Sequence, residues 1–232
     1  MEVAIQMSKS SERMVKRFGL PFRIAHWLTA FSFLMLYVTA LPMYTEFFDW
    51  LWPLLGGPAN ARFLHRVFGV TFMVPLFFMI LTDPKALFHW LKSCLTWRKH
   101  DFQFLLAFPF EFFGKHKNYP KQDFYNAGEK VNSILQIVAA IGIMGSGIII
   151  WNTSWFPNWL VDIGYPIHAI CVGLAAAVVV AHAYLGTFAP DGKVALGGMV
   201  KGEVPEEWAK RHHGRWVDEL EKTDKANKKK GA

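Results

Sequence analysis

Residues 165–188 read YPIHAICVGLAAAVVVAHAYLGTF, a stretch without a single Asp, Glu, Lys or Arg. A helix needs roughly 20 mostly apolar residues to cross the hydrocarbon core of a bilayer. Three further stretches meet this condition, at 22–43, 63–82 and 131–151. One such stretch can be a buried helix of a large soluble protein, but four in 232 residues indicate an all-α integral membrane protein. We expect the four spans to form a four-helix bundle.

The distribution of charge predicts how these spans are oriented. The chain is 53% hydrophobic and 19% charged, with a net charge of +7. Lys and Arg number four in 1–21, eight in 83–130 and ten in 189–232, whereas the connections 44–62 and 152–164 hold only one, Arg62. Because cytoplasmic loops are enriched in Lys and Arg, we expect both termini and the long middle connection in the cytoplasm. The basic residues form no single stripe, which argues against a nucleic-acid partner.

This topology divides the chain into three parts: a cytoplasmic N-terminal segment (1–21), a four-span domain (22–188) and a cytoplasmic tail (189–232). The tail alternates acidic and basic residues and is predicted to be an amphipathic helix with a Lys-rich end. In the middle connection, the aromatic segment Phe102–Phe113 is expected either to lie among the lipid headgroups or to pack against a partner subunit.

Four histidines lie inside the predicted spans, where ionisable side chains are costly and usually functional. In the expected orientation, His26 falls near the cytoplasmic end of the first span and His65 near the outer end of the second. His168 falls near the outer end of the fourth span, and His182 lies about 21 Å deeper on nearly the same helix face. Depth alone therefore predicts two pairs, His65 with His168 outside and His26 with His182 inside.

Two histidines on opposing helices are suited to a haem that only carries electrons, because they fill both axial positions of the iron. Two such haems at different depths would conduct electrons across the bilayer. A proton relay or a metal transport path is an alternative, but both usually include Asp or Glu, and the predicted spans contain neither. A haem-free membrane anchor or transport protein with structural histidines is the alternative from a different functional class.

Small and basic residues accompany these histidines. Gly69 and Gly186 each follow a histidine by one helical turn, which would leave room for a flat macrocycle, although small residues are also common where membrane helices pack. Arg23, Arg62 and Arg66 flank the histidines near the two membrane faces. They are candidate partners for haem propionates, and anchoring of the chain at the interface is the competing explanation.

Several short motifs point to one family. They are Arg23-Ile-Ala-His26-Trp27, Arg62-Phe-Leu-His65-Arg-Val-Phe-Gly69, Tyr125-Asn-Ala-Gly-Glu-Lys130, Ile167-His168-Ala169, Ala181-His182-Ala-Tyr184 and the tail sequence 198–216. Together they resemble the gamma subunit of membrane-bound respiratory formate dehydrogenase, a four-helix, di-haem cytochrome b. The cytochrome b subunits of nickel–iron hydrogenase and thiosulfate reductase share the overall plan, so a different electron donor is the alternative.

The resemblance implies partners and a direction of electron flow. A catalytic subunit with a molybdenum or tungsten pterin would oxidise formate outside the membrane, since this chain would hold no formate site. An iron–sulfur subunit would pass the electrons to a haem b held by His65 and His168. A second haem b, held by His26 and His182, would pass them to a quinone, either menaquinone or ubiquinone. The family's quinone pocket matches four positions here, which are Asn126, Gly128, Glu129 and His182.

The segment from Asn126 to Lys130 also fits this role by its own chemistry. Asn126 can hydrogen-bond a quinone carbonyl, and Gly128 permits close approach of the backbone. The same residues fit a helix start, with Asn126 as the cap and Glu129 three residues later. Glu129 stands where the resembled form has glutamine, and we expect this carboxylate to deliver a cytoplasmic proton to the reduced quinone.

The remaining histidines are predicted to lie on the surface; they are His89, His100, His116, His212 and His213. Among them, His89 or His116 is the candidate for assisting proton uptake. Cys94 and Cys171 are predicted to be packing residues, because two cysteines are too few for a disulfide framework or a zinc site.

Overall fold

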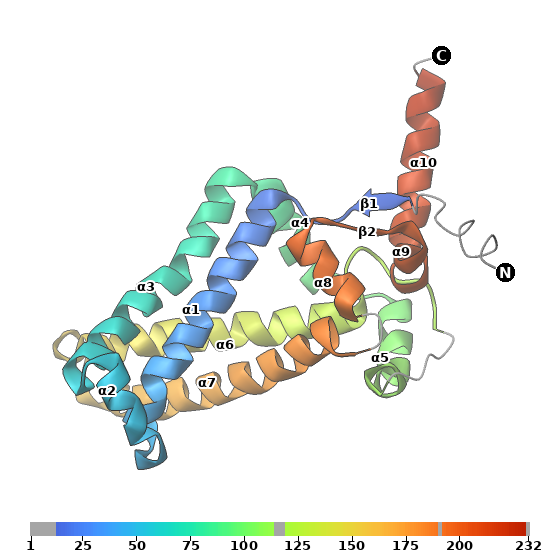
Figure 1. The fold of residues 1–232 in the computed structure, drawn as a ribbon. Coiled ribbons are helices and arrows are strands. Elements are labelled where there is room, and N and C mark those ends of the chain that lie inside the picture. Colours follow the sequence, from blue (N-terminus) through green and yellow to red (C-terminus); the bar gives the residue numbers. More distant parts are fainter. Residues whose placement is uncertain (1–12, 114–118, 190–191, 231–232) are drawn as a thin grey trace, which may run out of the picture. The chain divides into compact units, whose positions relative to one another are not determined.

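The computed structural model describes residues 13–113, 119–189 and 192–230, so Lys9 and His116 lie outside the described residues. Four helices of the described chain are long and apolar enough to cross a membrane, by length and composition. They are α1 (Leu20–Tyr44), α3 (Pro58–Thr82), α6 (Ala127–Trp151) and α7 (Asn158–Thr187) (Figure 1). The predicted helical class and the predicted number of spans are confirmed.

Three of these helices begin before their apolar stretches do. α3 starts at Pro58, α6 at Ala127 and α7 at Asn158. Hydropathy alone does not assign these first turns to the spans, because they contain polar side chains. Pro58 suits the first position of α3, because its φ is already fixed. As a consequence, Glu129 lies in the first turn of α6, in agreement with the helix start predicted at Asn126.

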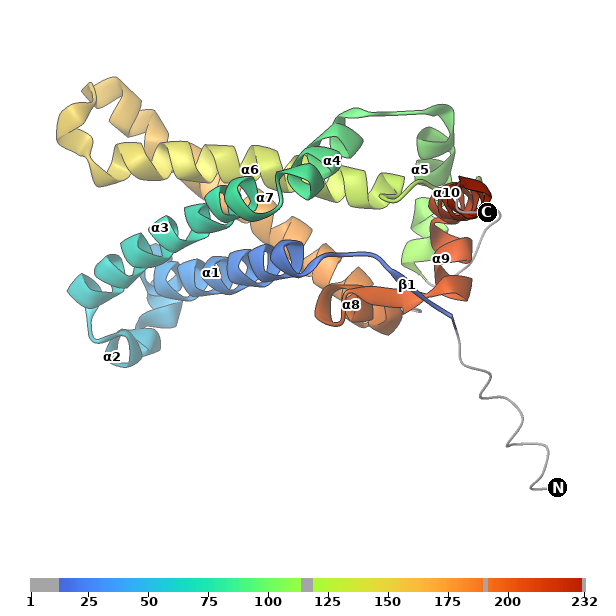
Figure 2. The same ribbon diagram turned by 90° about the horizontal axis from the view of Figure 1, so that it is seen from above.

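The chain divides into two compact units. Unit 2 comprises residues 19–89 and 142–168, and unit 1 comprises the described parts of 1–18, 90–141 and 169–232. In unit 2, α1 and α3 lie side by side (Figures 1 and 2). The 3-10 helix η2 (Glu46–Leu51) and the short α2 (Trp52–Leu55) connect them. Leu51, Leu55 and Ala61 form a buried cluster at this connection.

Unit 1 contains a two-stranded sheet between the N-terminal segment and the tail. β1 (Met14–Lys16) pairs antiparallel with β2 (Glu203–Pro205). The tail contains α8 (Gly192–Val200) before β2, and α9 (Glu206–His212) and α10 (Gly214–Lys230) after it. Trp208 and Trp216 are buried in one cluster with Val204. The predicted amphipathic tail helix corresponds to α10, whose first turn places Trp216 and Val217 in this cluster while most of its later residues are exposed.

The middle connection is helical. It contains α4 (Pro84–Leu95) and α5 (Lys99–Phe112), and α5 includes most of the aromatic segment Phe102–Phe113. This segment has two faces in the described part of the chain: Phe104 is buried, whereas Phe102 and Leu106 are exposed. The buried face packs within unit 1, so part of the segment's aromatic character, Phe104 above all, serves the fold of this chain.

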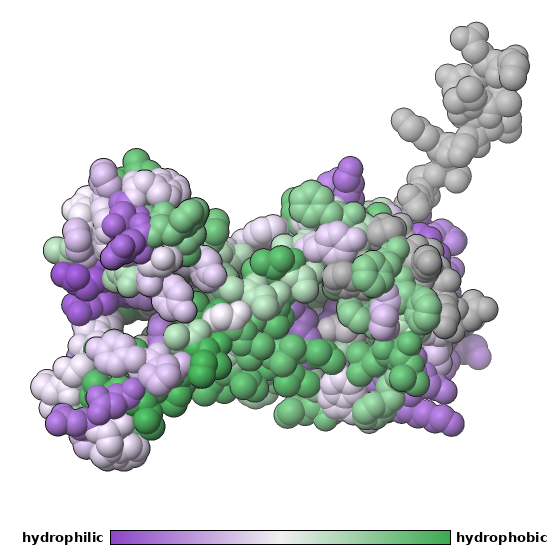
Figure 3. Space-filling model, turned by 90° about the horizontal axis from the view of Figure 1, so that it is seen from below, coloured by the Kyte–Doolittle hydropathy of each residue, from purple (hydrophilic) through white to green (hydrophobic). Residues whose placement is uncertain are grey.

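The four long helices expose apolar side chains over most of their surface. In the most apolar part of each helix, only 17% of the residues in α1 and 11% in each of the other three are buried inside the chain. On the face drawn in Figure 3, hydrophobic side chains (green) cover much of the surface. Exposed apolar surface of this extent would be unfavourable in water and suits contact with lipid.

Candidate functional site

His65 of α3 and His168 of α7 lie next to each other within unit 2. The centres of their imidazole rings are 6.4 Å apart, and the ring planes cross at 65°. Both side chains are partly buried. The depth argument predicted this pair from sequence, and the fold brings the two residues together.

Each of these rings also contacts a hydroxyl group from a further helix. Thr39 Oγ1 of α1 lies 3.0 Å from His65 Nδ1, and Ser146 Oγ of α6 lies 3.0 Å from His168 Nδ1. The sequence analysis missed both hydroxyls, because Ser and Thr are common in membrane helices, where they often bond only their own backbone. Nothing in a single sequence marks which of them faces a histidine.

The spacing of the two rings fits one metal ion between them. A first-row metal ion binds an imidazole nitrogen at about 2 Å, and the ring centre lies about 1 Å behind that nitrogen, so two axial imidazoles have centres about 6 Å apart. The observed 6.4 Å between His65 and His168 agrees with this value. Since both Nδ1 atoms contact hydroxyls, the Nε2 atoms are the ones that would bind the ion.

A flat ligand also has room beside His65. Gly69 follows His65 by one turn of α3, and a methyl group added at Gly69 would meet no described atom within 4 Å. Gly147 lies beside His168, where an added methyl group would contact the ring at 3.5 Å. Small side chains thus adjoin both histidines of the pair, as a macrocycle held between them would require.

The other two histidines belong to different units. His26 lies near the start of α1 in unit 2, with its ring centre 5.2 Å from that of Trp27. His182 lies near the end of α7 in unit 1. Their pairing stays a prediction.

The segment before α6 forms the expected capping arrangement. Asn126 Oδ1 accepts a hydrogen bond from the backbone N–H of Glu129 at 2.9 Å, and Glu129 Oε2 accepts one from the backbone N–H of Asn126 at 3.0 Å. This reciprocal pair is a capping box, which satisfies two N–H groups of the helix start. Because the oxygen of the Asn126 amide is used here, its NH₂ group is the part that can donate to a ligand.

Gly128 is closely packed between this cap and α5. A Cβ atom there would lie 3.2 Å from both Asn126 Oδ1 and Phe108 Cε2. Only a residue without a side chain fits this contact without displacing a neighbour. Glu129 also interacts electrostatically with His182 in the same unit. Four residues predicted for one site, Asn126, Gly128, Glu129 and His182, therefore belong to a single compact unit.

Arg17 is a site residue that the sequence analysis missed. Its side chain is 1% exposed, and Nη2 donates to Glu129 Oε1 at 2.8 Å. The guanidinium also lies over the rings of Phe124 and Trp208, at 5.7 Å and 5.2 Å from their centres. From sequence, Arg17 was only one of the basic residues of the N-terminal flank, because Glu129 lies more than 100 residues away along the chain.

A family comparison identifies the chain. The model of the family described as prokaryotic cytochrome b561 matches residues 17–202. The chain belongs to the prokaryotic cytochrome b561 family. Membership implies a b-type haem, and together with the four apolar helices it makes this cytochrome a multi-pass membrane protein. The fit of His65 and His168 to one metal ion agrees with a haem iron as that ion.

The cytochrome is similar to named subunits of formate dehydrogenases. It is 28% identical to the cytochrome b556(Fdn) subunit of the nitrate-inducible enzyme of Escherichia coli K12, over 94% of this chain and 96% of the relative. It is 27% identical to the cytochrome b556(fdo) subunit of the same organism, over 90% and 94%. The corresponding subunit of Haemophilus influenzae is 25% identical, over 90% and 85%. The resemblance seen in the motifs is confirmed along nearly the whole chain.

Two histidines of the cytochrome that were predicted at the surface are buried, which corrects that prediction. His213 is 0% exposed and His100 is 8% exposed. His213 lies against Trp208 and Trp216, and its Nδ1–H donates to the backbone oxygen of Asp123 at 3.0 Å. Its Nε2 atom lies 4.0 Å from Glu129 Oε1. Sequence reasoning failed here because a His-His pair among charged residues looks exposed.

Burial, together with the positive charge of Arg17, lowers the pKa of His213 from its ordinary value of 6.5 to about 3. The nearby carboxylate of Glu129 opposes this shift without cancelling it. His213 is therefore neutral in the folded cytochrome, and it becomes protonated when it is released.

We expect the attachment of the tail to weaken as the pH falls below about 6.5, because the unfolded state then binds a proton that the folded state does not. The stabilisation is fully present above that pH and declines towards the folded pKa of about 3. Limited proteolysis of the tail at about pH 7.5 and about pH 5 would measure it. The rate should rise less in His213→Phe, which cannot be protonated; an equal rise in both proteins would contradict a neutral, buried His213.

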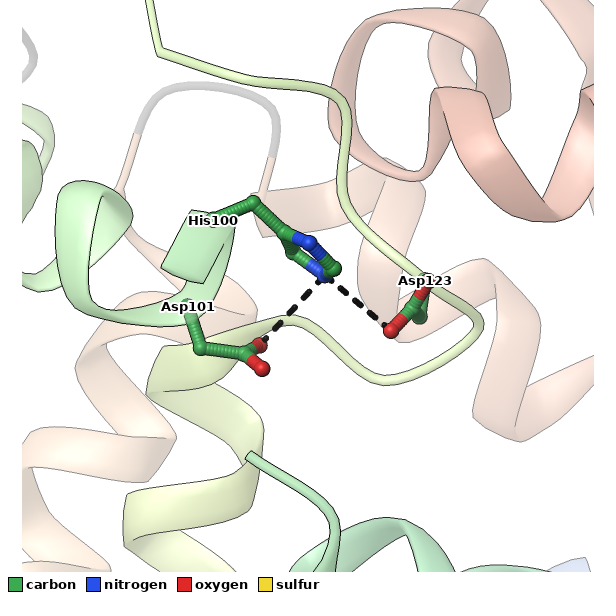
Figure 4. A group of neighbouring side chains, drawn as sticks. All are labelled: His100, Asp101 and Asp123. Atoms are coloured by element: carbon green, nitrogen blue, oxygen red, sulfur yellow. Dashed lines mark hydrogen bonds and ion pairs between the residues drawn. The ribbon is translucent and has the colours of Figure 1, made fainter. Parts of the chain in front are cut away.

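His100 belongs to a buried ion-pair network and not to the surface. Its Nε2 atom lies 3.1 Å from Asp123 Oδ2 and 3.9 Å from Asp101 Oδ1 (Figure 4). One histidine and two carboxylates could in principle hold a metal ion. However, Lys130 Nζ already lies 2.8 Å from Asp101 Oδ1 and 3.8 Å from Asp123 Oδ2. We therefore interpret the group as an ion-pair network in which the Lys130 ammonium serves as the cation.

Asp123 links this network to the tail. Arg215 Nε donates to Asp123 Oδ1 at 3.0 Å. Burial favours the neutral acid, but the hydrogen bond and charge of His100, with the charges of Arg98 and Lys130, lower the pKa of Asp123 below its ordinary value. Asp123 thus stays ionised and connects α5, α6 and α10.

The three arginines predicted near haem propionates lie on the spans. Arg23 is in the first turn of α1 and is partly buried, whereas Arg62 and Arg66 are exposed on α3. The Arg66 guanidinium lies 5.4 Å from the ring centre of Trp151. That contact supports anchoring at the interface for Arg66, and a role for any of the three towards propionates stays a prediction.

Proposed function

We propose that this cytochrome is the electron-transfer subunit of a formate:quinone oxidoreductase in a bacterial inner membrane, with both termini in the cytoplasm. The observation that carries the proposal is the His65–His168 pair, whose rings have the separation of two axial ligands. The formate dehydrogenase subunits to which the chain is similar supply the proposed donor.

In this proposal two haems b are bound, one by His65 and His168 and one by His26 and His182. Bound haem supplies one-electron redox chemistry, which the side chains of this protein lack. Partner subunits, one with iron–sulfur clusters and one with a molybdenum or tungsten pterin, would oxidise formate and deliver electrons at the outer pair. The chain would then position the reduction of menaquinone or ubiquinone at the cytoplasmic end.

The proposed quinone site consists of Asn126, Gly128, Glu129 and His182. The capping box supports it, since the box fixes the Asn126 side chain and leaves the amide NH₂ to donate to a quinone carbonyl. Glu129 would receive a cytoplasmic proton and pass it on. Arg17 favours the ionised carboxylate in the resting protein, and added negative charge on a reduced quinone nearby would raise the proton affinity of Glu129.

Charge separation follows from the proposed topology. Electrons would enter at the outer side, and protons would be taken up from the cytoplasm. Each electron carried across the membrane is worth about 2.3 kcal/mol per 100 mV of potential. The subunit would therefore help to generate the membrane potential.

The purified cytochrome and its native complex test the proposal directly. We expect reduced-minus-oxidised bands of b-type haem at two haems per chain, and co-purification with a formate-oxidising subunit. A chain that binds no haem when haem supply is adequate would be an anchor or transport protein instead. Co-purification with a hydrogenase would keep the cytochrome role but replace the donor.

Variants of the quinone site should lower quinone reduction by formate without removing haem. Asn126→Asp keeps an oxygen that can cap α6 but removes the amide donor, and loss of such a hydrogen bond corresponds to roughly a tenfold or greater reduction in rate. Asn152→Ala is the control, because Asn152 lies at the other end of α6 and bonds its own helix. Steady-state reduction of a soluble quinone by the complex measures the effect.

Glu129→Gln separates proton delivery from binding, since glutamine keeps the shape and can keep the cap. We expect slower quinol formation with little change in the quinone concentration needed for half-maximal rate. If Glu129→Gln forms quinol at the normal rate while Asn126→Asp does not, Glu129 does not deliver the proton.

A further inference from the structure

Two buried hydroxyl groups contact the rings of His65 and His168, and the direction of these hydrogen bonds indicates which ring nitrogen carries the proton. Thr39 is 0% exposed and Ser146 is 4% exposed, so neither hydroxyl has water as a main partner. They come from different helices, α1 and α6, and each contacts a histidine of another helix. All four residues belong to unit 2.

Each hydroxyl has a single hydrogen, which a backbone carbonyl receives. Thr39 Oγ1 lies 2.8 Å from the carbonyl oxygen of Met35 and 3.0 Å from that of Leu36. Ser146 Oγ lies 2.5 Å from the carbonyl oxygen of Gly142. Two oxygen atoms this close repel each other unless a hydrogen lies between them, so each hydroxyl hydrogen points to its own helix.

The histidine side of each contact must then supply the other hydrogen. A hydroxyl that donates to a carbonyl presents only lone pairs to the ring, so Nδ1 of His65 and of His168 carries the proton. A neutral imidazole protonated on Nδ1 has a free lone pair on Nε2. Both Nε2 atoms are therefore prepared to bind iron before any haem arrives.

We propose that Thr39 and Ser146 are positioning residues for the outer haem: they fix the tautomer and the ring planes of His65 and His168 and lower the reduction potential of the iron between them. This inference rests on the proposed function, because it assumes a haem bound by these two histidines. A hydrogen bond from Nδ1–H makes the imidazole a stronger electron donor, which stabilises the ferric state. The same hydroxyls hold the ring planes at their crossing angle of 65°.

Redox titration of the purified cytochrome tests the proposal. In Thr39→Val and Ser146→Ala, we expect two haems to remain bound and the midpoint potential of one of them to rise. The electron paramagnetic resonance spectrum of the ferric form should change for the same haem, because it depends on the angle between the axial ring planes. Thr39→Ser and Ser146→Thr keep a hydroxyl and should restore the wild-type potential and spectrum.

Thr71→Val provides the matched control. Thr71 lies on α3, as His65 does, and bonds the carbonyl oxygen of Val67 in the same way, but this hydrogen bond is exposed. Its replacement should change neither potential nor spectrum.

Unchanged potentials in Thr39→Val and Ser146→Ala, with both haems bound, would overturn this inference and leave the proposed function intact. The proposed function itself fails on a different result, namely two haems still bound in His65→Ala and in His168→Ala. If Thr39→Val or Ser146→Ala loses the outer haem altogether, the result is compared with that of the variant at the same position that keeps a hydroxyl. Restored binding with a normal potential in Thr39→Ser or Ser146→Thr supports the role of the hydroxyl, and failure to restore it contradicts that role.

Discussion

Replacing His65 by alanine is expected to remove one of the two proposed haems and leave the other in place. The absorbance of b-type haem per chain should fall by about half, because a haem that only carries electrons depends on both axial ligands. His168→Ala should remove the same haem, since the two rings lie 6.4 Å apart in one unit. Optical spectroscopy and redox titration of the purified variants identify the haem that is lost.

Double variants test which histidines bind the same haem. His65→Ala with His168→Ala should retain one haem, as each single variant does, whereas His65→Ala with His182→Ala should retain none. His89→Ala is a suitable control, because His89 lies on α4, outside the four long helices. Loss of both haems in the first double variant, or one retained in the second, would contradict the assignment of His65 with His168 and of His26 with His182.

The spans and the outer pair could be predicted from sequence because they depend on local pattern and depth. An apolar stretch of the right length predicts a span wherever it occurs, and the Lys and Arg distribution supplies an order of depths for the histidines. His65 and His168 then fall at one level without knowledge of any contact. The capping box of Asn126 and Glu129 was equally accessible, since its residues are three positions apart.

The rest of the site depends on contacts between distant parts of the chain. Arg17 reaches Glu129 across more than 100 residues, and His213 reaches the backbone of Asp123 across 90. A basic residue in a basic flank and a histidine in a charged tail look exposed until the fold covers them. Thr39 and Ser146 escaped notice for a related reason, because a hydroxyl in a membrane helix already has its own carbonyl as a partner.

These distant contacts bring residues of the N-terminal segment and of the tail to Glu129 of the proposed quinone site. Arg17 follows β1, which pairs with β2 of the tail, and its guanidinium binds Glu129. His213 follows α9 and lies against the same carboxylate. Arg17 and His213 therefore both lie against the first turn of α6, and the buried Trp208 packs beside them.

The second large effect is expected from Lys130, the next residue after Glu129. The side chains of Lys130 and Asp101 are 2% and 0% exposed, and Nζ lies 2.8 Å from Oδ1. Lys130→Met would leave the carboxylate of Asp101 buried without its ion-pair partner. Removal of one member of a buried pair lowers the free energy of unfolding by about 3–5 kcal/mol. We expect this loss in the free energy of unfolding of the cytochrome in detergent, followed by circular dichroism.

A double variant distinguishes the ion pair from the shape of the side chains. Asp101 Oδ2 also accepts a hydrogen bond from the backbone N–H of Arg98 at 2.8 Å, so Asp101→Asn can keep this cap while removing the charge. Lys130→Met combined with Asp101→Asn should therefore be more stable than Lys130→Met alone, because no unpaired charge remains. If the double variant is the less stable of the two, the cost arises from packing and not from charge.

The exposed pair of Lys121 and Asp218 is a control, because its N–O distance is close to that of the buried pair and only its exposure is much greater. Its Nζ and Oδ2 atoms are 2.9 Å apart, as close as the buried pair, but the side chains are 62% and 46% exposed. Water and salt screen such a pair, so Lys121→Met should leave the unfolding transition almost unchanged. A large effect of Lys130→Met beside a negligible one of Lys121→Met would show that burial, and not the ion-pair distance, makes the attachment of α5 to α6 strong. Since Gly128, in the same first turn of α6, lies against Phe108 of α5, the Lys130 variant should also lower quinone reduction.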